Sequence, residues 1–546
     1  MYFNKSYIPS RRKRTIHMKE NFSLITLLIF LLTACQNEKV PIKQEAILRL
    51  ACEESASSMD PRYPANLITR NLLHMLYEGL MKIDHQGKVI PALALSVEVS
   101  ADLKTYTFAL KDTKWSDGTP LTAKDFEQSW MSVLLPSFPS KNLDLLYIIK
   151  GARAFKEGNG SAEAVGIQAL DAKHLRIQLE NPTPYFLKVV TTHLYFPVHS
   201  SIRCMQKKEN YPLVTNGPFK VKEWKSSAEI ILAKNSCYWD AKVVALDAVI
   251  LSRMNANHAY KMFERGKVDY VGSPLSHLPS QAMPALKHQE LLKIKPATIM
   301  HGLQFNAKNT FLSNIKIRKA FNMALNRKVI AALATQGANS PATGILPPLA
   351  DWEAINYYQD NDLPAAWQLF QEALQEMKMD KDSLPQLTLT YANTDTQRAI
   401  AQAVQQQWNH AFGFTIQLQK QEPEVFARTT DKGDYQIALN SWYARFSDPL
   451  SFLESFKVYN PAFSQEEHTK YLGLLTFSSI ENDKDQRRKY LEKAERLLMN
   501  AMPIAPLLFG SYTYAESENL GGIGLSDLGI LDIKYAFLKD INEGPP

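Results

Sequence analysis

The segment 105–130 constrains the fold more than any other part of this chain, because it specifies a strand, a turn and a helix in succession. Residues 105–110 (Thr-Tyr-Thr-Phe-Ala-Leu) alternate large apolar side chains with smaller ones, which predicts a strand with one apolar face. The tripeptide 116–118 (Ser-Asp-Gly) predicts a turn, since short polar side chains bond nearby backbone and glycine accepts positive φ. Thr122 is a good helix N-cap, and Asp125 stands at the capping-box position. On local chemistry alone, this could be any strand-turn-helix joint.

The same segment carries a family resemblance. The residues concerned are Lys111, Asp112, Trp115, Ser116, Asp117, Gly118, Pro120, Thr122, Ala123, Lys124, Asp125 and Phe126. Together they resemble the signature of the extracytoplasmic solute-binding proteins of peptide ABC importers, and within these the oligopeptide-binding proteins. Similar matches recur from about residue 46 to about residue 540, in the segments 76–80, 216–224, 230–235, 238–239 and 267–270.

The resemblance implies an α/β fold of the periplasmic-binding-protein-like, type II class, with two lobes and an extra inserted domain. The implied boundaries are 1–34 for a lipoprotein signal peptide, 35–77, 198–299 and 515–546 for a discontinuous lobe I, 78–197 for the inserted accessory domain, and 300–514 for lobe II. Length independently predicts two or three domains, because a chain of 546 residues exceeds the roughly 250 to 300 residues at which a single core stops growing.

A βαβ pattern predicts an α/β domain without the resemblance. A strand at 387–391, a helix at 396–412 ended by Gly413 and a strand at 414–418 predict a parallel sheet. Further expected elements are a strand at 46–52, a helix at 66–80, a strand at 299–306 that crosses into lobe II, and helices at 314–334, 367–377 and 484–499. The basic face of the helix at 314–334 is expected to be solvated; it consists of Arg318, Lys319, Arg327 and Lys328.

The N-terminus has the order of a lipoprotein export signal. Residues 1–34 hold six basic residues and one acidic residue, and an apolar run at 24–32 follows the basic part. This run is shorter than the about 20 residues that a membrane-spanning helix needs, which indicates a signal peptide. Leu-Thr-Ala-Cys then closes the run in the manner of a lipobox, so we expect lipid attachment at Cys35. Met18 is an alternative start, because the residues from Met18 onward already form a complete signal.

Composition argues against several other functions. Subtracting the net +5 of residues 1–34 from the total of +7 leaves +2, so the mature surface is near neutral and no nucleic-acid partner is expected. Cys52, Cys204 and Cys237 would remain after processing, an odd number whose pairing stays open. The sequence contains no Cys-x-x-Cys, His-Glu-x-x-His, phosphate loop or Gly-x-Ser-x-Gly. We therefore expect no metal site, no cofactor and no catalytic residues.

The resemblance places the ligand-binding segment at 438–449. The residues expected to contact an extended peptide are Asn440, Ser441, Trp442, Tyr443, Ala444, Arg445, Gln397 and Tyr63. Family members carry an Asp that binds the peptide's α-amino group where this chain has Arg445. A guanidinium at that position predicts a preference for a ligand carboxylate, unless Arg445 turns to solvent and Asp448 anchors the ligand. Gln397 and Pro423 stand where peptide-binding relatives carry His and Trp.

These features predict a lipid-anchored, monomeric substrate-binding protein of an ABC importer, which closes two lobes over its ligand at the cell envelope. The expected ligand is an oligopeptide or an acidic peptide-like compound such as a murein peptide. The expected partners are the ABC permease, its ATPase subunits and, through the lipid, a membrane. The alternatives are a nickel-chelate or haem binder of the same family, and an envelope lipoprotein that acts as an enzyme or adhesin.

Overall fold

The computed structural model of the chain describes residues 45–84, 86–139, 143–203, 213–225, 228–349, 351–380, 383–458 and 460–539. The chain divides into two units, 1–45 and 46–546, and every helix and strand below belongs to the second unit. The predicted signal segment, Cys35 and Cys204 lie outside the described residues. Within the described ranges, no helix is long and apolar enough to cross a membrane.

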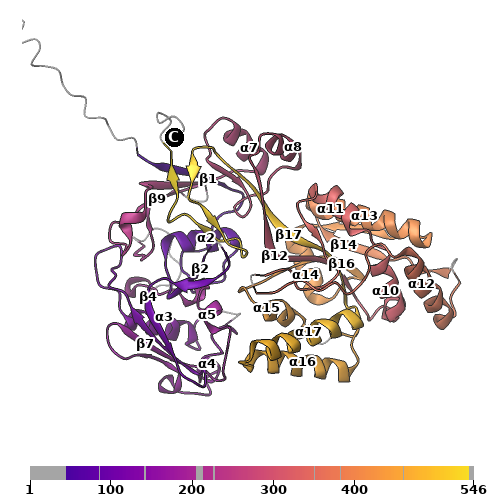
Figure 1. The fold of residues 1–546 in the computed structure, drawn as a ribbon, viewed down its shortest axis with the longest axis horizontal. Helices are drawn as coiled ribbons and strands as arrows, with labels where there is room; N and C mark the ends of the chain where they lie inside the picture. Colours follow the sequence, from indigo (N-terminus) through magenta and orange to yellow (C-terminus); the bar gives the residue numbers. More distant parts are fainter. Residues whose placement is uncertain are drawn as a thin grey trace, which may run out of the picture. The chain divides into compact units, whose positions relative to one another are not determined.

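The largest sheet has eleven strands and contains the two longest strands of the unit, β12 and β17 (Figure 1). Its spatial order is β15 (Gln417–Gln421), β14 (Thr388–Ala392), β16 (Ile437–Tyr443), β12 (Leu292–Phe305), β17 (Ile504–Glu516), β11 (Tyr270–Gly272), β1 (Ile47–Cys52), β10 (Ala248–Arg253), β9 (Glu229–Lys234) and β8 (Phe219–Lys225), with β13 (Ser340–Pro341) paired to β17 beside this path. The strand predicted at 299–306 is confirmed. It begins earlier, at Leu292, because residues 292–296 pair with the second half of β17.

A separate four-stranded sheet contains the strand predicted at 105–110. Its order is β4 (Ala94–Val99), β5 (Thr105–Leu110), β7 (His174–Gln178) and β6 (Ile167–Ala169). Alternate side chains of β5 are buried, as predicted. Helix α3 (Ala123–Leu134) begins after Thr122, whose N–H and hydroxyl donate to the Asp125 carboxylate at 2.9 Å and 3.1 Å. The predicted strand, turn and capping box are therefore confirmed.

Helix α2 (Leu67–Leu76) ends earlier than the predicted segment 66–80. Asn66 is its N-cap, as the start of the prediction implies. The side chain of Asn216 accepts a hydrogen bond from the Glu78 N–H at 3.3 Å and donates one to the Glu78 carbonyl at 2.9 Å. These bonds hold the backbone after α2 in an extended form, because its polar groups pair with a distant turn instead of the preceding helical turn. The prediction of a helix up to residue 80 is therefore wrong.

The predicted helix at 314–334 is divided into α10 (Ile315–Met323) and α11 (Arg327–Thr335). The prediction that its basic face is solvated is wrong for Arg318 and Arg327, which are both buried. Arg318 donates to four backbone carbonyls, two of them at the end of α17 (Lys484–Ala501). The buried charge is thus surrounded by acceptors, which offsets much of the cost of removing it from water.

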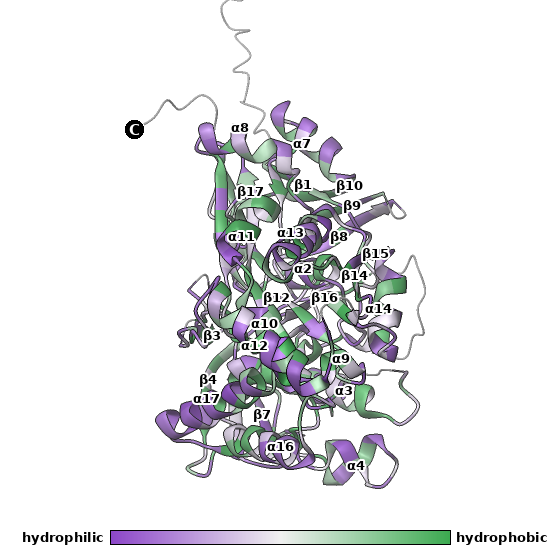
Figure 2. Ribbon diagram, turned by 90° about the vertical axis from the view of Figure 1, so that its right-hand side faces the viewer, coloured by the Kyte–Doolittle hydropathy of each residue, from purple (hydrophilic) through white to green (hydrophobic). Residues whose placement is uncertain are grey.

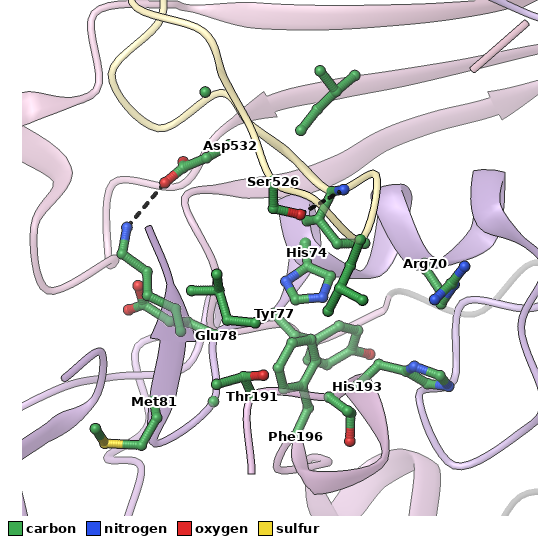
Figure 3. A pocket seen from close by; sticks show the side chains of 18 of the residues that line it. Arg70, His74, Tyr77, Glu78, Met81, Thr191, His193, Phe196, Ser526 and Asp532 are labelled. Carbon is green, nitrogen blue, oxygen red and sulfur yellow. Dashed lines mark hydrogen bonds and ion pairs between the residues drawn. The ribbon is translucent and has the colours of Figure 1, made fainter. Parts of the chain in front are cut away.

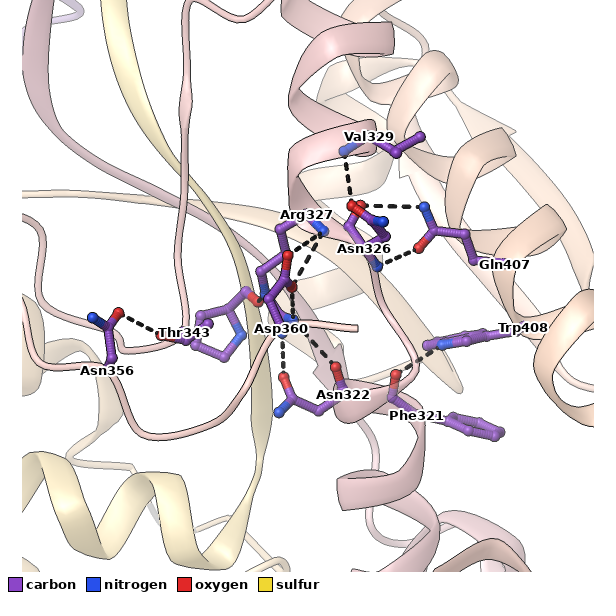
Figure 4. A network of polar contacts seen from close by, with 11 residues as sticks. Phe321, Asn322, Asn326, Arg327, Val329, Thr343, Asn356, Asp360, Gln407 and Trp408 are labelled. Carbon is purple, nitrogen blue, oxygen red and sulfur yellow. Dashed lines mark hydrogen bonds and ion pairs between the residues drawn. The ribbon is translucent and has the colours of Figure 1, made fainter. Parts of the chain in front are cut away.

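Arg327 occupies a second buried polar network (Figure 4). Its guanidinium donates to the Pro506 carbonyl at 2.8 Å and to the Asp360 carboxylate at 3.0 Å. At the break between the two helices, Asn326 caps α11 and its backbone exchanges hydrogen bonds with the Gln407 side chain at 2.8 Å and 3.2 Å. The helix can break at this point because the side chains of Asn326 and Gln407 bond the backbone N–H and C=O groups that the break leaves without helical partners.

The predicted βαβ unit is confirmed, since β14 and β15 pair in parallel and α13 (Asp395–Phe412) connects them. Gly413 caps this helix with a φ of 72°. The second strand begins at Gln417, three residues after the start of the predicted segment. Phe414 instead packs against Phe370 in an aromatic cluster, with ring centroids 6.1 Å apart.

The remaining elements complete the unit. The helices are α4 (Ala152–Lys156), α5 (Phe186–Val189), α6 (Ser200–Arg203), α7 (Ala256–Glu264), α8 (Met283–His288), α9 (Thr310–Ser313), α12 (Leu363–Met377), α14 (Pro423–Lys432), α15 (Pro449–Leu453), α16 (Gln465–Ile480) and α17 (Lys484–Ala501). Short strand pairs are β2 (Met81–Ile83) with β3 (Val89–Pro91), β18 (Leu520–Gly521) with β21 (Phe537–Leu538), and β19 (Gly524–Leu525) with β20 (Leu531–Asp532). The predicted helices at 367–377 and 484–499 correspond to α12 and α17, and Figure 2 shows that α17 is largely hydrophilic.

Candidate ligand-binding site

A cavity of about 910 Å³ lies beside α2 (Figure 3). Most of its lining comes from four parts of the chain, 62–84, 191–196, 443–445 and 522–535. Its volume falls within the range of ligand pockets in proteins, about 300 to 1,000 Å³. The cavity is therefore large enough for a small organic ligand or a short peptide.

One wall of the cavity is built from segments that carry the family resemblance. Glu78 accepts hydrogen bonds from the Tyr238 hydroxyl at 3.0 Å and the Trp239 indole N–H at 2.5 Å. The Gly217 N–H donates to the Leu76 carbonyl at 2.8 Å, which brings two backbone segments into direct contact. The matching segments 76–80, 216–219 and 238–239 thus meet in space and form a rigid wall.

Most charged side chains around the cavity are already paired. Lys82 lies 3.0 Å from Asp532, and Lys534 lies 2.7 Å from Asp240. Lys295 donates to the backbone carbonyl of Leu525. Each of these lysines therefore has a protein partner, and a ligand group that paired with a lysine would first have to displace that partner.

Arg445 is paired as well. It lines the cavity, and its guanidinium lies 2.6 Å from Asp144 and 3.2 Å from Glu454. Asp448, the alternative ligand anchor, is buried and lies 2.7 Å from Arg487. It also caps α15 by accepting from the Leu450 N–H. The carboxylate preference hypothesised for Arg445 stays a prediction. A ligand carboxylate would have to compete with Asp144 and Glu454, which already bind this guanidinium.

The remaining predicted ligand residues fall into two groups. Tyr63, Tyr443 and Ala444 line the cavity, as Arg445 does. Asn440, Ser441 and Trp442 lie on β16 beside β12 and are not among the lining residues. The Asn440 amide donates to Gln304 at 3.0 Å, and the Ser441 hydroxyl lies 2.8 Å from the His301 ring nitrogen. The Trp442 ring packs against Phe456, with centroids 5.6 Å apart. Gln397 and Pro423 lie in the first turns of α13 and α14, and the Gln397 side chain accepts from the Ala392 N–H at 2.7 Å. The structure therefore brings half of the expected set to the cavity.

Arg70, His74 and His193 are not among the site residues predicted from the sequence. All three line the cavity. Burial lowers the pKa of His74 to about 3, with the charges of His193 and Arg70 acting in the same direction, and burial lowers the pKa of His193 to about 4. Both imidazoles are therefore neutral at pH 7 and can donate or accept one hydrogen bond at each nitrogen.

The signal that could have found these residues was weak. Arg70 and His74 are four positions apart on α2, so they share one face of the helix. Thr69 and Asn71 are polar too, so the sequence does not set Arg70 and His74 apart. His193 comes from a distant segment, and only the tertiary structure brings it near the other two. In the described ranges, no group of three or more His, Cys, Asp or Glu side chains is arranged to hold a metal ion.

The fold and cavity agree with comparisons to known proteins. Residues 88–463 match the family model of bacterial extracellular solute-binding proteins, family 5. The chain is 34% identical over 545 residues to the oligopeptide-binding protein OppA of Bacillus subtilis, covering 96% of this chain and 100% of that protein. It is 31% identical over 513 residues to the dipeptide-binding protein DppE of the same organism, covering 92% and 93%.

A solved structure supports the same assignment. The periplasmic oligopeptide-binding protein OppAIV of Borrelia burgdorferi superposes with a TM-score of 0.78 at 25% identity, over 90% of this chain and 100% of that one. The α/β architecture is thus that of a periplasmic binding protein. This chain belongs to the family 5 bacterial extracellular solute-binding proteins, as the resemblance in the sequence predicted.

Proposed function

We propose that this protein is the peptide-binding component of an ABC importer and takes an oligopeptide or a peptide-like compound into the cavity beside α2. The cavity carries this proposal, because it measures about 910 Å³ and one of its walls is built from segments that carry the family resemblance, in a chain 34% identical to an oligopeptide-binding protein. Its aromatic and apolar lining suits varied side chains, and hydrogen bonds to the ligand backbone would supply affinity. The protein acts as a monomer that delivers ligand to the permease and ATPase subunits, and it performs no catalysis.

Calorimetric titration with synthetic di- to pentapeptides tests this function. At least one length class should bind with a Kd in the micromolar range or below. Native mass spectrometry of the purified protein should reveal co-purified peptides. A nickel chelate, haem or bile-acid-sized ligand in that spectrum, combined with no peptide binding by calorimetry, would contradict the proposal.

We propose Tyr63, Tyr443, Ala444 and Arg445 as ligand contacts, because they line the cavity. Asn440, Ser441 and Trp442 would support β16, the strand that ends at Tyr443. Gln397 would stabilise the start of α13. Alanine replacement of Tyr443, which is 54% exposed, should weaken peptide binding with little effect on thermal stability. Tyr535 is 50% exposed and also lines the cavity, in the segment 522–535. Its replacement by alanine would show whether this segment contributes to peptide affinity.

We also propose that the mature protein begins at Cys35 and is anchored to a membrane by a lipid on this residue. The support is the basic start, the short apolar run and the Leu-Thr-Ala-Cys sequence. Cys35→Ser should release the protein from the membrane fraction and remove a lipid mass. Cys237→Ser is the matched control and should leave the protein in the membrane fraction. Wild-type protein that is soluble and lacks the lipid mass would contradict the anchor.

A further inference from the structure

The charged side chains that line the cavity differ in one respect. Glu78, Lys82, Asp532, Lys534 and Arg445 each have a hydrogen-bond or ion-pair partner in the protein. Arg62 pairs with Asp60, Asp84 accepts from two backbone N–H groups, and Lys295 donates to a carbonyl. Arg70 is the exception, since no hydrogen bond or ion pair to its guanidinium is present among the described residues.

Arg70 is also partly removed from water. Its side chain is half-buried on α2, and its Nε atom is buried without an acceptor. Burial lowers the pKa of Arg70, and the Tyr512 hydroxyl opposes this shift. A guanidinium nevertheless stays protonated in proteins, so the group carries a charge at neutral pH. A desolvated cation without an anion is costly for the protein. A ligand that supplies an anion at this point would therefore gain more than one that pairs with an already neutralised charge.

The neighbours of Arg70 can complete such a site. Figure 3 shows Arg70 and His193 at one end of the pocket, away from the Lys82–Asp532 ion pair, with His74 between these groups. His74 packs edge-on against Phe196, with ring centroids 4.9 Å apart, and this contact orients its ring. His193 already forms a hydrogen bond with the Tyr63 backbone, so its ring is held in place beside the guanidinium. The neutral imidazole of His74 offers one N–H donor to an anion without adding repulsion between cations.

Resting on the proposed function, we propose that Arg70 is the specificity-determining residue of the cavity and binds a carboxylate of the ligand, with His74 as a neutral hydrogen-bonding neighbour. A carboxylate fits best, because the planar guanidinium fork donates two parallel hydrogen bonds to its two oxygens. The carboxylate can come from the peptide C-terminus or from an acidic side chain. These two sources share the same chemistry and are separated by the ligands used in the test.

The test is calorimetric titration of the full-length protein with one peptide that binds wild type, prepared as the free acid, as the C-terminal amide, and as the amide with an acidic last residue. Wild type should bind the free acid about 10- to 100-fold more tightly than the neutral amide, since hydrogen bonds to a charged group are among the stronger ones. Tight binding of the acidic amide as well would assign the site to side-chain carboxylates.

Three variants locate the effect. Arg70→Gln should abolish the preference for the carboxylate ligand, and Arg70→Lys should retain part of it, because charge remains while the fork is lost. Arg176→Gln is the matched control, since Arg176 is half-buried on β7 and does not line the cavity. Arg70→Gln should melt at or above the temperature of wild type, because it removes a desolvated cation that has no partner among the described residues, and Arg176→Gln should melt close to wild type.

The outcomes distinguish the two proposals. If peptides bind wild type but the free acid and neutral amide have equal affinity, or if Arg70→Gln keeps the preference, the assignment of Arg70 is overturned and the peptide-binding function remains. If no peptide of any form binds wild type, the proposed function fails and the assignment of Arg70 fails with it.

Discussion

At the scale of single residues, the cations around the cavity differ in whether a carboxylate already neutralises them. Arg445 attracts attention in the sequence because the family resemblance implies an Asp at this position, but in the fold it lies between Asp144 and Glu454. Among the residues that the structure describes, no carboxylate pairs with Arg70. The physical significance of a charge in a binding site depends on its neighbours, since a paired guanidinium offers little to a ligand and an unpaired one offers a strong hydrogen-bonding site.

Arg445→Asp should shift ligand preference towards peptides with a free α-amino group. The substitution removes the cation between Asp144 and Glu454 and adds a third carboxylate, so the local charge becomes strongly negative. We expect the affinity ratio of free-amine to N-acetylated peptide to rise by roughly 3- to 10-fold at low salt, and less at high salt. Calorimetry at two salt concentrations measures this ratio. An unchanged ratio at both would mean that the ligand's amino group does not approach residue 445.

Glu495 predicts a pH-dependent stability. It is buried and accepts hydrogen bonds from the N–H groups of Ile345 and Leu346 and from the Tyr357 hydroxyl. Burial outweighs these bonds and raises the pKa of Glu495 from 4.5 to about 7. Because the folded protein then binds the proton more tightly than the unfolded chain, the free energy of unfolding should fall as pH rises from about 4.5 to about 7.

Glu495→Gln should remove this part of the pH dependence, because the amide keeps an acceptor for the two N–H groups and does not titrate. Urea unfolding at pH 5 and pH 8 measures the difference. Relative to the variant, wild type should lose roughly 1 to 3 kcal/mol between these values. Parallel pH profiles for the two proteins would show that Glu495 titrates alike in the folded and unfolded chain.

At the scale of elements, the segment after α2 is shaped by a turn that lies far away in sequence. Gly217 approaches the backbone so closely that a Cβ atom would lie 2.5 Å from the Leu76 carbonyl carbon. Asn216 supplies the side-chain bonds to Glu78 on the same side. This junction holds the end of α2 and the wall around Glu78 in place. The same helix carries Arg70 and His74.

Gly217→Ala should therefore destabilise the protein by about 1 to 3 kcal/mol, since the added methyl meets backbone that can yield only by moving α2. Peptide affinity should fall as well, because α2 lines the cavity. Gly473→Ala in α16 is the control: its Cβ would meet nothing closer than 4.0 Å, and alanine favours a helix. Denaturant unfolding of both variants gives the comparison, and equal stabilities would refute the close-packing argument.

At the scale of the whole molecule, β12 and β17 pair along most of their lengths and join the β14–β16 part of the large sheet to the β1–β11 part. Their pairing contains register shifts between Pro296 and Met300 and between His301 and Gly302. Such irregularities interrupt the ladder and are places where paired strands can bend. We propose that the predicted lobes move about this region when ligand binds.

Ligand binding should then compact the protein. Small-angle scattering of the mature chain with a calorimetrically confirmed peptide should give a radius of gyration smaller by roughly 1 Å than without peptide. A peptide that does not bind in calorimetry is the control and should leave the radius unchanged. An equal radius in the saturated complex would exclude closure as the binding mechanism.

The sequence by itself determined the local elements and the family. The alternation in β5, the capping box of α3, the Gly413 cap and the βαβ pattern depend on neighbours within a few residues, so they could be read from the chain. The family followed from contiguous motifs, which the match over residues 88–463 confirmed.

Only the tertiary structure decided the end of α2, the burial of Arg318 and Arg327, and the identity of the unpaired cation. Each depends on partners distant in sequence: Asn216 for α2, the carbonyls of Ala501 in α17 and Pro506 in β17 for the two buried arginines, and Asp144 for Arg445. A basic residue on a helical face has the same sequence pattern whether it is solvated, paired or buried. Its role follows from which acceptors the fold brings within hydrogen-bonding distance, and that is decided by packing between segments hundreds of residues apart.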